Sequence, residues 1–256
     1  MTGNPFSLDG KTALVVGASR GIGLAIAQAL ARSGAHTVLA ARSLDTLEEH
    51  AAALRGAGCT AAALAFDVAQ PDWNAIDALG AIDILVNVAG TNRRKPFLDY
   101  SREEYDRLLE TNLHGIVAVT RHVGRSMMER GRGGKIVHIG SLMSLLGLPY
   151  VTVYAMSKSA LAGLTRSLAA EWGRYNIQVN CIAPGFILTD LNRDMWQPPE
   201  MAKWLEGVQA NPRLGTPEDI APLAVLLSGP GSDYITGQVI AVDGGYTTTA
   251  RWPFEP

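Results

Sequence analysis

Short, uninterrupted apolar runs recur along the chain and alternate with longer stretches in which apolar residues return every three or four positions. The runs predict seven buried strands, at residues 12–16, 37–41, 61–66, 82–86, 135–139, 177–182 and 239–242. The periodic stretches predict helices between them, most clearly at residues 21–33, 101–130 and 153–174. Strands that are apolar on both faces and alternate with helices indicate an α/β fold, a doubly wound seven-stranded parallel sheet with helices on both faces.

The chain is expected to form a single domain, residues 1–256, because it has no internal repeat, low-complexity tract or linker. Residues 188–216 interrupt the alternation of strands and helices with two Trp and three Pro residues. Ligands of open α/β sheets bind outside the carboxyl ends of the strands, which is where this segment has to leave the sheet. We therefore expect a substrate lid at about residues 188–216, the alternative being a surface insertion that only packs.

Charge and cysteine content exclude several classes of protein. The chain has 22 Lys and Arg against 24 Asp and Glu, with no block of five or more like charges, so neither nucleic acid nor a membrane is expected as a partner. Two cysteines without a C-x-x-C motif predict no disulfide scaffold and no metal site. The first ten residues lack the basic and apolar regions of a signal peptide, so we expect a cytoplasmic protein.

Three glycines follow the first predicted strand at the spacing G-x-x-x-G-x-G and lead into a helix. They are Gly17, Gly21 and Gly23, with Ser19, Arg20 and Ile22 between them. Glycines let the backbone approach a pyrophosphate closely, and the amino terminus of the helix offers N–H groups to it. This order of strand, turn and helix predicts a Rossmann fold that binds a dinucleotide.

The end of the second predicted strand indicates which dinucleotide is bound. A fold of this kind usually carries an acidic residue there when the cofactor is NAD. Here the strand ends in Ala41 and Arg42, without a carboxylate. Arg42 and Arg20 can clamp a 2′-phosphate through their planar guanidinium groups, so NADP is favoured over NAD. The alternative is that both arginines are solvated turn residues.

Tyr154 and Lys158 stand four positions apart, and therefore on one face of a predicted helix. A phenol has a pKa near 10, and a neighbouring cation lowers it by favouring the phenolate. The pair predicts an acid/base group that acts near neutral pH.

From Gly10 to Tyr246 the chain resembles the short-chain dehydrogenase/reductase family, both in these motifs and in further residues. The matching features are the glycine turn, Asp67, Asn87-Val88-Ala89-Gly90, Asn112, Ser141, Tyr154, Lys158, Asn180, Pro184-Gly185 and Val242-Asp243-Gly244-Gly245. The resemblance implies a homotetramer built through the two long helices. It also implies that Asp67 meets the adenine, that the loop after the fourth strand forms the cofactor floor, and that Ile187 and Thr189 hold the nicotinamide carboxamide.

The expected cofactor-binding residues are Gly17, Ser19, Arg20, Gly21, Ile22, Gly23, Arg42, Asp67, Val68, Asn87, Ala89, Gly90, Tyr154, Lys158, Pro184, Gly185, Ile187 and Thr189. The expected catalytic residues are Asn112, Ser141, Tyr154 and Lys158. Ser141 is expected to bind the substrate oxygen while Tyr154 donates a proton to it. Lys158 is expected to lower the pKa of Tyr154 and to bind the nicotinamide ribose, and Asn112 to anchor a water that passes protons to solvent.

Two positions depart from the family pattern. Val16 stands where a Thr is common, and Val88 replaces the second Asn of the usual N-N-A-G. Both changes replace a polar side chain by an apolar one, so we expect altered rigidity of the cofactor loops and a functional enzyme.

The substrate is indicated less directly. Within the family the chain is most similar to gluconate 5-dehydrogenases and related sugar-acid dehydrogenases, and Arg93 and Arg94 are placed to bind a carboxylate unless they form a solvated basic turn. Met143 and Trp196 are further candidate substrate contacts. These features predict an NADP-dependent oxidoreductase that interconverts a ketone and a secondary alcohol on a small oxo acid or keto sugar acid such as gluconate or 5-ketogluconate.

Two other functions stay open. The apolar stretch at residues 142–150 favours a 3-oxoacyl-(acyl-carrier-protein) reductase or a general reductase of hydrophobic ketones. A non-catalytic NADP-binding sensor is the third possibility, although it would normally lack the Tyr or the Lys. Residues 251–256 carry Trp252 and Phe254, and we expect this tail to pack on a neighbouring subunit, a frayed end being the alternative.

Overall fold

The computed structural model describes residues 4–190 and 192–249. Within them a single parallel sheet has the strand order β3-β2-β1-β4-β5-β6-β7. The strands are β1 (Thr12–Val16), β2 (His36–Ala41), β3 (Ala61–Ala65), β4 (Ile84–Asn87), β5 (Gly134–Ile139), β6 (Ile177–Pro184) and β7 (Val239–Val242). The predicted seven-stranded parallel sheet is confirmed, and no strand end differs from the prediction by more than two residues.

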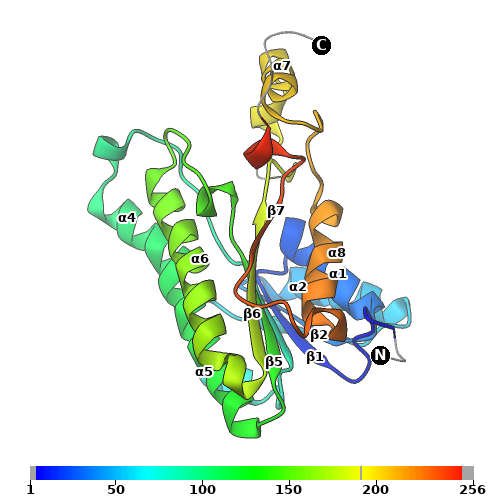
Figure 1. Ribbon diagram of the computed structural model, residues 1–256. Helices are drawn as coiled ribbons and strands as arrows, with labels where there is room; N and C mark the ends of the chain where they lie inside the picture. Colours follow the sequence, from blue (N-terminus) through cyan, green and yellow to red (C-terminus); the bar gives the residue numbers. More distant parts are fainter. Residues whose placement is uncertain (1–3, 191, 250–256) are drawn as a thin grey trace.

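Helices cover both faces of the sheet. They are α1 (Gly21–Arg32), α2 (Leu44–Gly56), α3 (Trp73–Asp77), α4 (Arg102–Leu109), α5 (Gly115–Arg130), α6 (Thr152–Trp172), α7 (Pro199–Val208) and α8 (Pro217–Ser228). Helices α1, α2 and α8 lie on one side of the sheet, and α4, α5 and α6 lie on the other (Figure 1).

Two apolar layers result, one on each face. Leu30 of α1, Leu47 of α2 and Ile220 of α8 are buried in the first layer. Ile116 of α5 and Leu161 of α6 are buried in the second. Side chains of alternate strand residues point into these two layers, which explains why the strand sequences are apolar throughout.

The long helix predicted at residues 101–130 is interrupted. Its start is a capping box, in which Ser101 and Glu104 satisfy each other's backbone N–H groups. A π-helical turn at Glu110–His114 then separates α4 from α5. Such a turn inserts one residue into the helix and is frequent at functional sites. The apolar periodicity continues through it, which is why the sequence pattern indicated one helix.

The strand order places the candidate site. β1 lies between β2 and β4, so the direction in which strands are added reverses at the β1–β4 boundary. Ligands bind in the crevice that such a reversal creates at the carboxyl ends of the strands. Because all seven strands are parallel, the loops after β1, β4, β5 and β6 meet at this edge.

Residues 188–190 and 192–216 stand beyond the carboxyl end of β6, and the second of these ranges contains a short 3₁₀ turn, η5 (Asp194–Trp196), followed by α7 (Figure 1). An isolated parallel bridge between Ile187 and Gly215 joins the two ends of the segment. The amide of Leu188 donates to the Gly215 carbonyl at 2.8 Å, and the amide of Gly215 donates to the Phe186 carbonyl at 2.9 Å. The base of the segment is thereby fixed to the end of β6.

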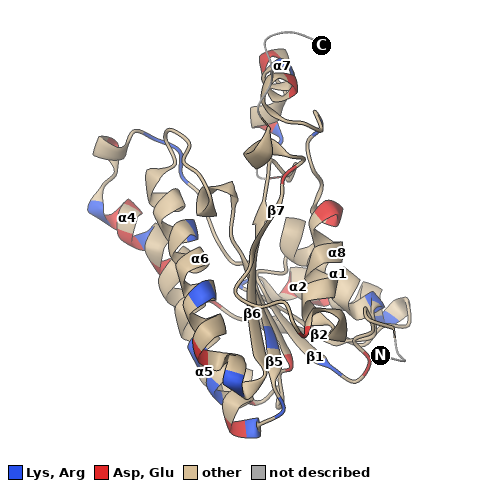
Figure 2. Ribbon diagram, viewed as in Figure 1, with Lys and Arg blue, Asp and Glu red and all other residues tan. Residues whose placement is uncertain are grey.

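The surface carries both signs of charge, interspersed along α4 and α5 (Figure 2). No helix in the described part of the chain is long and apolar enough to cross a membrane. Cys59 and Cys181 are unpaired. The tail for which a subunit contact is expected, residues 251–256, lies outside the described residues.

Candidate active site

The turn between β1 and α1 admits only glycine at two positions. A Cβ on Gly17, whose φ is +96°, would stand 2.5 Å from the backbone nitrogen of Ala89, and a Cβ on Gly23 would stand 2.0 Å from the Gly17 carbonyl oxygen. The Val16 carbonyl accepts hydrogen bonds from the amides of Val88 and Ala89, at 2.8 and 2.9 Å. The loops after β1 and β4 are therefore held together through the backbone, despite the apolar side chains of Val16 and Val88.

Arginines flank this turn on the side of β2. Arg20 is the N-cap residue of α1, Arg42 follows β2, and both are exposed. His50 of α2 hydrogen-bonds through Nε2 to the carbonyl oxygen of Ser19, at 3.2 Å. The contact fixes the peptide that precedes Arg20, and nothing in the local sequence of α2 indicated it.

The loop after β3 packs against the start of α5. The Asp67 carboxylate accepts a hydrogen bond from the amide of Ala69 at 2.9 Å. Val68 is buried, and a Cβ on Gly115 would stand 2.5 Å from its carbonyl oxygen. Glycine at position 115 therefore lets α5 approach this loop.

Asn87 ends β4, and its side chain is engaged inside the protein. Its amide nitrogen lies 3.0 Å from the hydroxyl of Thr120 and 3.2 Å from Nδ1 of His138. Burial and the charge of Lys158 lower the pKa of His138 to about 4, so this ring is neutral at physiological pH. The sequence placed Asn87 at the cofactor floor, whereas its side chain points between β4, β5 and α5.

Tyr154 and Lys158 lie on successive turns of α6. The Lys158 ammonium is 5.7 Å from the centroid of the Tyr154 ring and donates to the carbonyl oxygen of Ile139 at 2.8 Å. Ser141 follows β5, and its side chain is hydrogen-bonded to that of Tyr154. The structure therefore brings together the three residues that the sequence predicted as a group.

Ser144 ties this group to the helix, a role that the sequence reasoning missed. Its hydroxyl donates to the carbonyl oxygen of Lys158 at 2.8 Å and accepts from the amide of Ser141 at 3.3 Å. Its position three residues after Ser141, at the end of the 3₁₀ turn η3 (Leu142–Ser144), is typical of a local cap.

Burial has the largest effect on the pKa of Tyr154. Burial raises the pKa of Tyr154, and the hydrogen bond to Ser141 and the charge of Arg94 only oppose this. Burial also lowers the pKa of Lys158 to about 8. The net shift of the Tyr154 pKa is therefore upward, and the groups that oppose it are Ser141 and Arg94. That Lys158 lowers the pKa of Tyr154 stays a prediction.

Asn112 lies in the π-helical turn and is fully buried. Its carboxamide accepts from the amide of Thr91 at 2.7 Å and donates to the carbonyl of the same residue at 2.8 Å. It also donates to the hydroxyl of Ser157, at 3.3 Å. A Cβ on Gly90 would stand 3.4 Å from the Asn112 side-chain oxygen and 3.5 Å from the Lys158 ammonium, so this loop borders both groups.

The two arginines after β4 have different partners. Arg93 forms a 2.8 Å ion pair with Glu104, which also binds Lys95 at 2.6 Å. Arg94 contacts the sulfur of Met195 and lies close enough to Tyr154 to influence its pKa. Of the expected carboxylate clamp, Arg94 therefore has no carboxylate partner among the described residues and lies near Tyr154, whereas Arg93 shares the Glu104 carboxylate with Lys95.

Apolar side chains surround Tyr154 on the side of the 188–216 segment. Met143 is buried with Leu142 and Val151, and Tyr154, Phe186 and Tyr246 pack against them. Phe186 in turn makes edge-to-face contacts with Trp196 and Trp204, both at 5.4 Å, and with Tyr246 at 5.0 Å. The indole N–H of Trp196 is buried and has no hydrogen-bond partner among the described residues.

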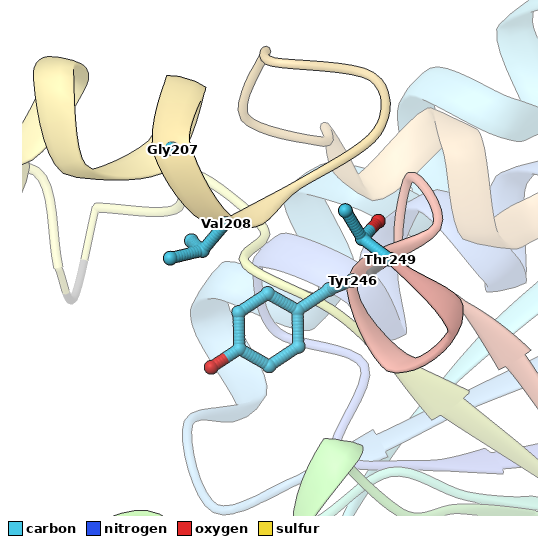
Figure 3. A pocket seen from close by; sticks show the side chains of 4 residues that line it. All are labelled: Gly207, Val208, Tyr246 and Thr249. Carbon is cyan, nitrogen blue, oxygen red and sulfur yellow. The ribbon is translucent and has the colours of Figure 1, made fainter. Parts of the chain in front are cut away.

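A hollow of about 320 Å³ adjoins Tyr246, one of these aromatic residues. It is lined by Gly207 and Val208 at the end of α7 and by Tyr246 and Thr249 near the end of the described chain (Figure 3). Tyr246 thus both lines this hollow and contacts the ring of Phe186 edge to face.

The residues after β6 pack first against the loop after β7 and then against the glycine turn after β1. A Cβ on Gly185, which follows Pro184, would stand 2.6 Å from Cα of Asp243. Thr189 lies opposite Gly21, because its methyl group would be 3.5 Å from a Cβ placed there. The segment after β6 and the turn after β1 thus form two sides of one site.

Comparison with known proteins agrees with this geometry. A family model described as enoyl-(acyl carrier protein) reductase matches residues 17–247. A gluconate 5-dehydrogenase from Gluconobacter oxydans (strain 621H) is 40% identical over 251 residues, which cover 95% of this chain and 97% of that protein. The chain belongs to the short-chain dehydrogenase/reductase family.

Other similar members of the short-chain dehydrogenase/reductase family act on a different substrate class or have known structures. The 3-oxoacyl-(acyl-carrier-protein) reductase FabG of Chlamydia trachomatis serovar D is 39% identical over 247 residues, 93% of this chain and 98% of that protein. The crystal structure of a gluconate 5-dehydrogenase from Burkholderia cenocepacia J2315 in complex with NADP and tartrate has a TM-score of 0.92 and 38% identity, covering 96% of this chain and 98% of that chain.

Proposed function

We propose that this short-chain dehydrogenase/reductase is an NADP(H)-dependent oxidoreductase that interconverts a ketone and a secondary alcohol on a keto sugar acid such as 5-ketogluconate and gluconate. The observation that carries the proposal is the position of Arg94, a cation without a carboxylate partner in the described structure, beside Tyr154 and Ser141. Such a cation can bind the carboxylate of a substrate whose carbonyl oxygen reaches Tyr154. The 40% identity to a gluconate 5-dehydrogenase supports the same substrate class.

The glycine turn fits the pyrophosphate of the cofactor. A side chain at Gly17 or Gly23 would collide with backbone, so the chain can approach a bound phosphate there, and the amino terminus of α1 supplies N–H groups. Arg20 and Arg42 fit a 2′-phosphate, because no carboxylate ends β2. NADP bound in similar structures supports this assignment. When bound, the nicotinamide supplies a hydride to the substrate carbonyl carbon or accepts one from the alcohol.

Tyr154 is proposed as the acid and base. Burial raises its pKa, so the phenol is protonated at neutral pH and donates its proton to the substrate oxygen during reduction. Ser141, hydrogen-bonded to Tyr154, is placed to donate a second hydrogen bond to the same oxygen. The Lys158 ammonium stabilises the phenolate that forms, because opposite charges attract strongly in this buried setting.

Asn112 is proposed to hold the water path that returns the proton to Tyr154. Its carboxamide fixes the backbone of Thr91 and reaches Ser157, which lies one residue before Lys158. Asn112 lies within the π-helical turn, which adds one residue to the helix. Without this extra residue, the side chains on one side of the turn would point in a different direction relative to those on the other side.

Residues 188–216 are proposed as a substrate lid on a single domain of residues 1–256. The contact between Met195 and Arg94 joins this segment to the loop after β4, and the Trp196 ring joins it to Phe186. The unpartnered indole N–H of Trp196 is suited to a substrate hydroxyl or carboxylate oxygen. Met143, buried beneath the site, is proposed to shape the pocket.

Reduction of hydrophobic ketones or 3-oxoacyl thioesters is the second candidate. It is favoured by the apolar cluster of Leu142, Met143 and Val151 around Tyr154, and by the 39% identity to a 3-oxoacyl-(acyl-carrier-protein) reductase. This function does not require Arg94, so the response of Arg94 variants separates the two candidates.

We also propose a cytoplasmic homotetramer. Two unpaired cysteines fit a reducing compartment, and the family resemblance supports assembly through α4, α5 and α6. Exposed apolar residues on these elements and beside them, such as Met156 and Leu98, fit a buried contact between subunits.

Oxidation of gluconate by the purified protein tests the proposed function. We expect reduced cofactor to appear with gluconate and NADP⁺, at a rate about tenfold or more above that with NAD⁺ because two arginines face the 2′-phosphate. Absence of turnover with gluconate, together with turnover of a hydrophobic alcohol, would replace the proposed substrate class by the second candidate. A preference for NAD⁺ would contradict the roles of Arg20 and Arg42.

A further inference from the structure

Asn192 directs its whole side chain at the backbone that follows β6. Its carboxamide nitrogen donates to the carbonyl oxygen of Ile187 at 2.8 Å. Its carboxamide oxygen accepts from the amide of Thr189 at 2.8 Å, and its own amide donates to the Thr189 carbonyl at 3.1 Å. These hydrogen bonds tie Asn192 back to Ile187 and Thr189 and fix the orientation of the peptide groups that they join.

The turn held by Asn192 is attached to the rest of the protein at its start. Ile187 is 6% exposed and pairs with Gly215, where an added Cβ would stand 2.5 Å from the Ile187 side chain. The base of the segment is therefore held by packing and by a β-bridge. Thr189, two residues further on, is half-buried, and Asn192 restrains its backbone through the Thr189 amide and carbonyl.

The same turn borders the nucleotide site. Thr189 lies opposite Gly21, the first residue of α1, whose amino terminus fits the pyrophosphate. The arginines that fit the adenosine end lie on the β2 side of this point, and β6 lies on the other side of β1 in the sheet. The backbone at Ile187 and Thr189 therefore faces the nicotinamide half of a dinucleotide.

Two hydrogen-bond donors of this turn are available to the nicotinamide half of a dinucleotide. Within residues 4–190 and 192–249, the amide of Ile187 and the hydroxyl of Thr189 have no hydrogen-bond partner. Asn192 occupies the carbonyl of Ile187 and the amide of Thr189, so the peptide planes are set while these two donors remain available.

We propose that Asn192 is a positioning residue of the cofactor site, which holds Ile187 and Thr189 in place for the nicotinamide half without touching the cofactor itself. Loss of its side chain frees the turn, so that binding must order residues that are ordered in advance in the wild type. The inference rests on the proposed function only for the identity of the dinucleotide and is independent of the substrate.

Calorimetric titration of the full-length protein with two nucleotides tests the proposal. NADP⁺ carries both halves, whereas 2′,5′-ADP carries only the adenosine half. In Asn192→Ala we expect NADP⁺ to bind about tenfold more weakly, the effect of losing the ordering by two hydrogen bonds, and 2′,5′-ADP to bind as in the wild type. Asn192→Asp retains the acceptor for the Thr189 amide and should fall between the two proteins.

Asn211→Ala is the matched control, because Asn211 lies in the same segment and its side chain makes no hydrogen bond within the described residues. We expect it to bind both nucleotides as the wild type does. Hydrogen exchange adds a second readout, since the Thr189 amide should exchange faster in Asn192→Ala while the amides of β6 stay protected.

Three results would overturn the proposal. Equal NADP⁺ affinity in Asn192→Ala and the wild type would make the turn a local cap without effect on the cofactor. Tighter NADP⁺ binding would show that Asn192 occupies groups that the cofactor needs. An equal loss for NADP⁺ and 2′,5′-ADP would show general damage to the fold. If the wild type prefers NAD⁺, the assigned cofactor is wrong, and titration with NAD⁺ and AMP then tests Asn192 in the same way.

Discussion

The buried ammonium of Lys158 donates a 2.8 Å hydrogen bond to the carbonyl oxygen of Ile139 at the end of β5. The contact places a cation at the carboxyl edge of the sheet, two residues from Ser141 and one helical turn from Tyr154. One hydrogen bond does not offset the desolvation of a buried ammonium. Burial accordingly lowers the pKa of Lys158 from its ordinary value of 10.5 to about 8.

A pH-dependent stability follows from this shift. Below pH 8 both the folded and the unfolded chain carry the Lys158 proton, and the folded protein bears the cost of burying the charge. Between about pH 8 and 10.5 the folded protein has released the proton while the unfolded chain retains it, so stability rises with pH. From pH 7.5 to 9.5 the free energy of unfolding of the wild type should gain about 2 kcal/mol over that of Lys158→Met. Urea unfolding of both cofactor-free proteins at the two pH values measures the difference, and parallel pH profiles would contradict it.

Removal of the Tyr154 hydroxyl should abolish most of the activity and leave the cofactor bound. Tyr154→Phe keeps the ring that packs against the apolar cluster around Met143 but has no proton to donate. We expect kcat to fall at least about 100-fold, the usual contribution of a general acid, with an unchanged Kd for NADP⁺. Tyr234→Phe is the control, since Tyr234 is fully exposed and precedes β7, at the opposite edge of the sheet from the site. Substantial turnover by Tyr154→Phe would remove Tyr154 from the mechanism.

A side chain at Gly17 should destabilise the protein by colliding with the neighbouring loop, in addition to the strain of its backbone conformation. Gly17 and Gly58 both have a positive φ, of +96° and +85°, but a Cβ on Gly17 meets Ala89 at 2.5 Å whereas one on Gly58 meets nothing within 4 Å. Gly58→Ala should cost about 1 kcal/mol of stability through strain alone. Gly17→Ala should cost about 3 kcal/mol or more and weaken NADP⁺ binding. Equal melting temperatures for the two variants would show that the loops after β1 and β4 separate easily.

Cofactor preference should depend on Arg42. Its guanidinium is exposed at the end of β2, where no carboxylate repels a phosphate. Arg42→Ala should reduce the ratio of kcat/KM for NADPH over NADH by about 10- to 100-fold, mainly through NADPH. Arg174→Ala, an exposed arginine stacked on Tyr175 in another part of the molecule, should leave the ratio unchanged. An unchanged ratio in Arg42→Ala would mean that the 2′-phosphate is bound elsewhere.

Most of the fold was accessible from the sequence because its signals are local. Strands buried on both faces leave continuous apolar runs, and Gly17 and Gly23 mark a turn whose geometry excludes side chains. The π-helical turn at Glu110–His114 was not accessible, since it retains the apolar period of the helices on either side. The position of Asn112 therefore came from the family resemblance and not from the helical pattern.

The site was predictable as a set of residues but not as a set of interactions. The spacing of Tyr154 and Lys158 places them on one helical face, yet the direction of the pKa shift of Tyr154 depends on burial by residues far away in the sequence. Arg93 and Arg94 are indistinguishable until Glu104, from α4, pairs with one of them. The contact between Thr189 and Asn192 joins residues three positions apart, the same spacing as in a capping box, so the sequence indicated it only weakly.

The central claim, that a sugar-acid carboxylate is bound beside Tyr154, is tested most directly by one steady-state comparison. We would measure kcat/KM with NADPH for 5-ketogluconate and for an acetoacetyl thioester, in the wild type, Arg94→Ala and Arg93→Ala. The account predicts that the wild type prefers 5-ketogluconate, that Arg94→Ala lowers this preference by about 10- to 100-fold, and that Arg93→Ala, whose guanidinium pairs with Glu104, changes it by less than about threefold. A wild-type preference for the thioester, unaffected by Arg94→Ala, would contradict it and assign the pocket to hydrophobic ketones.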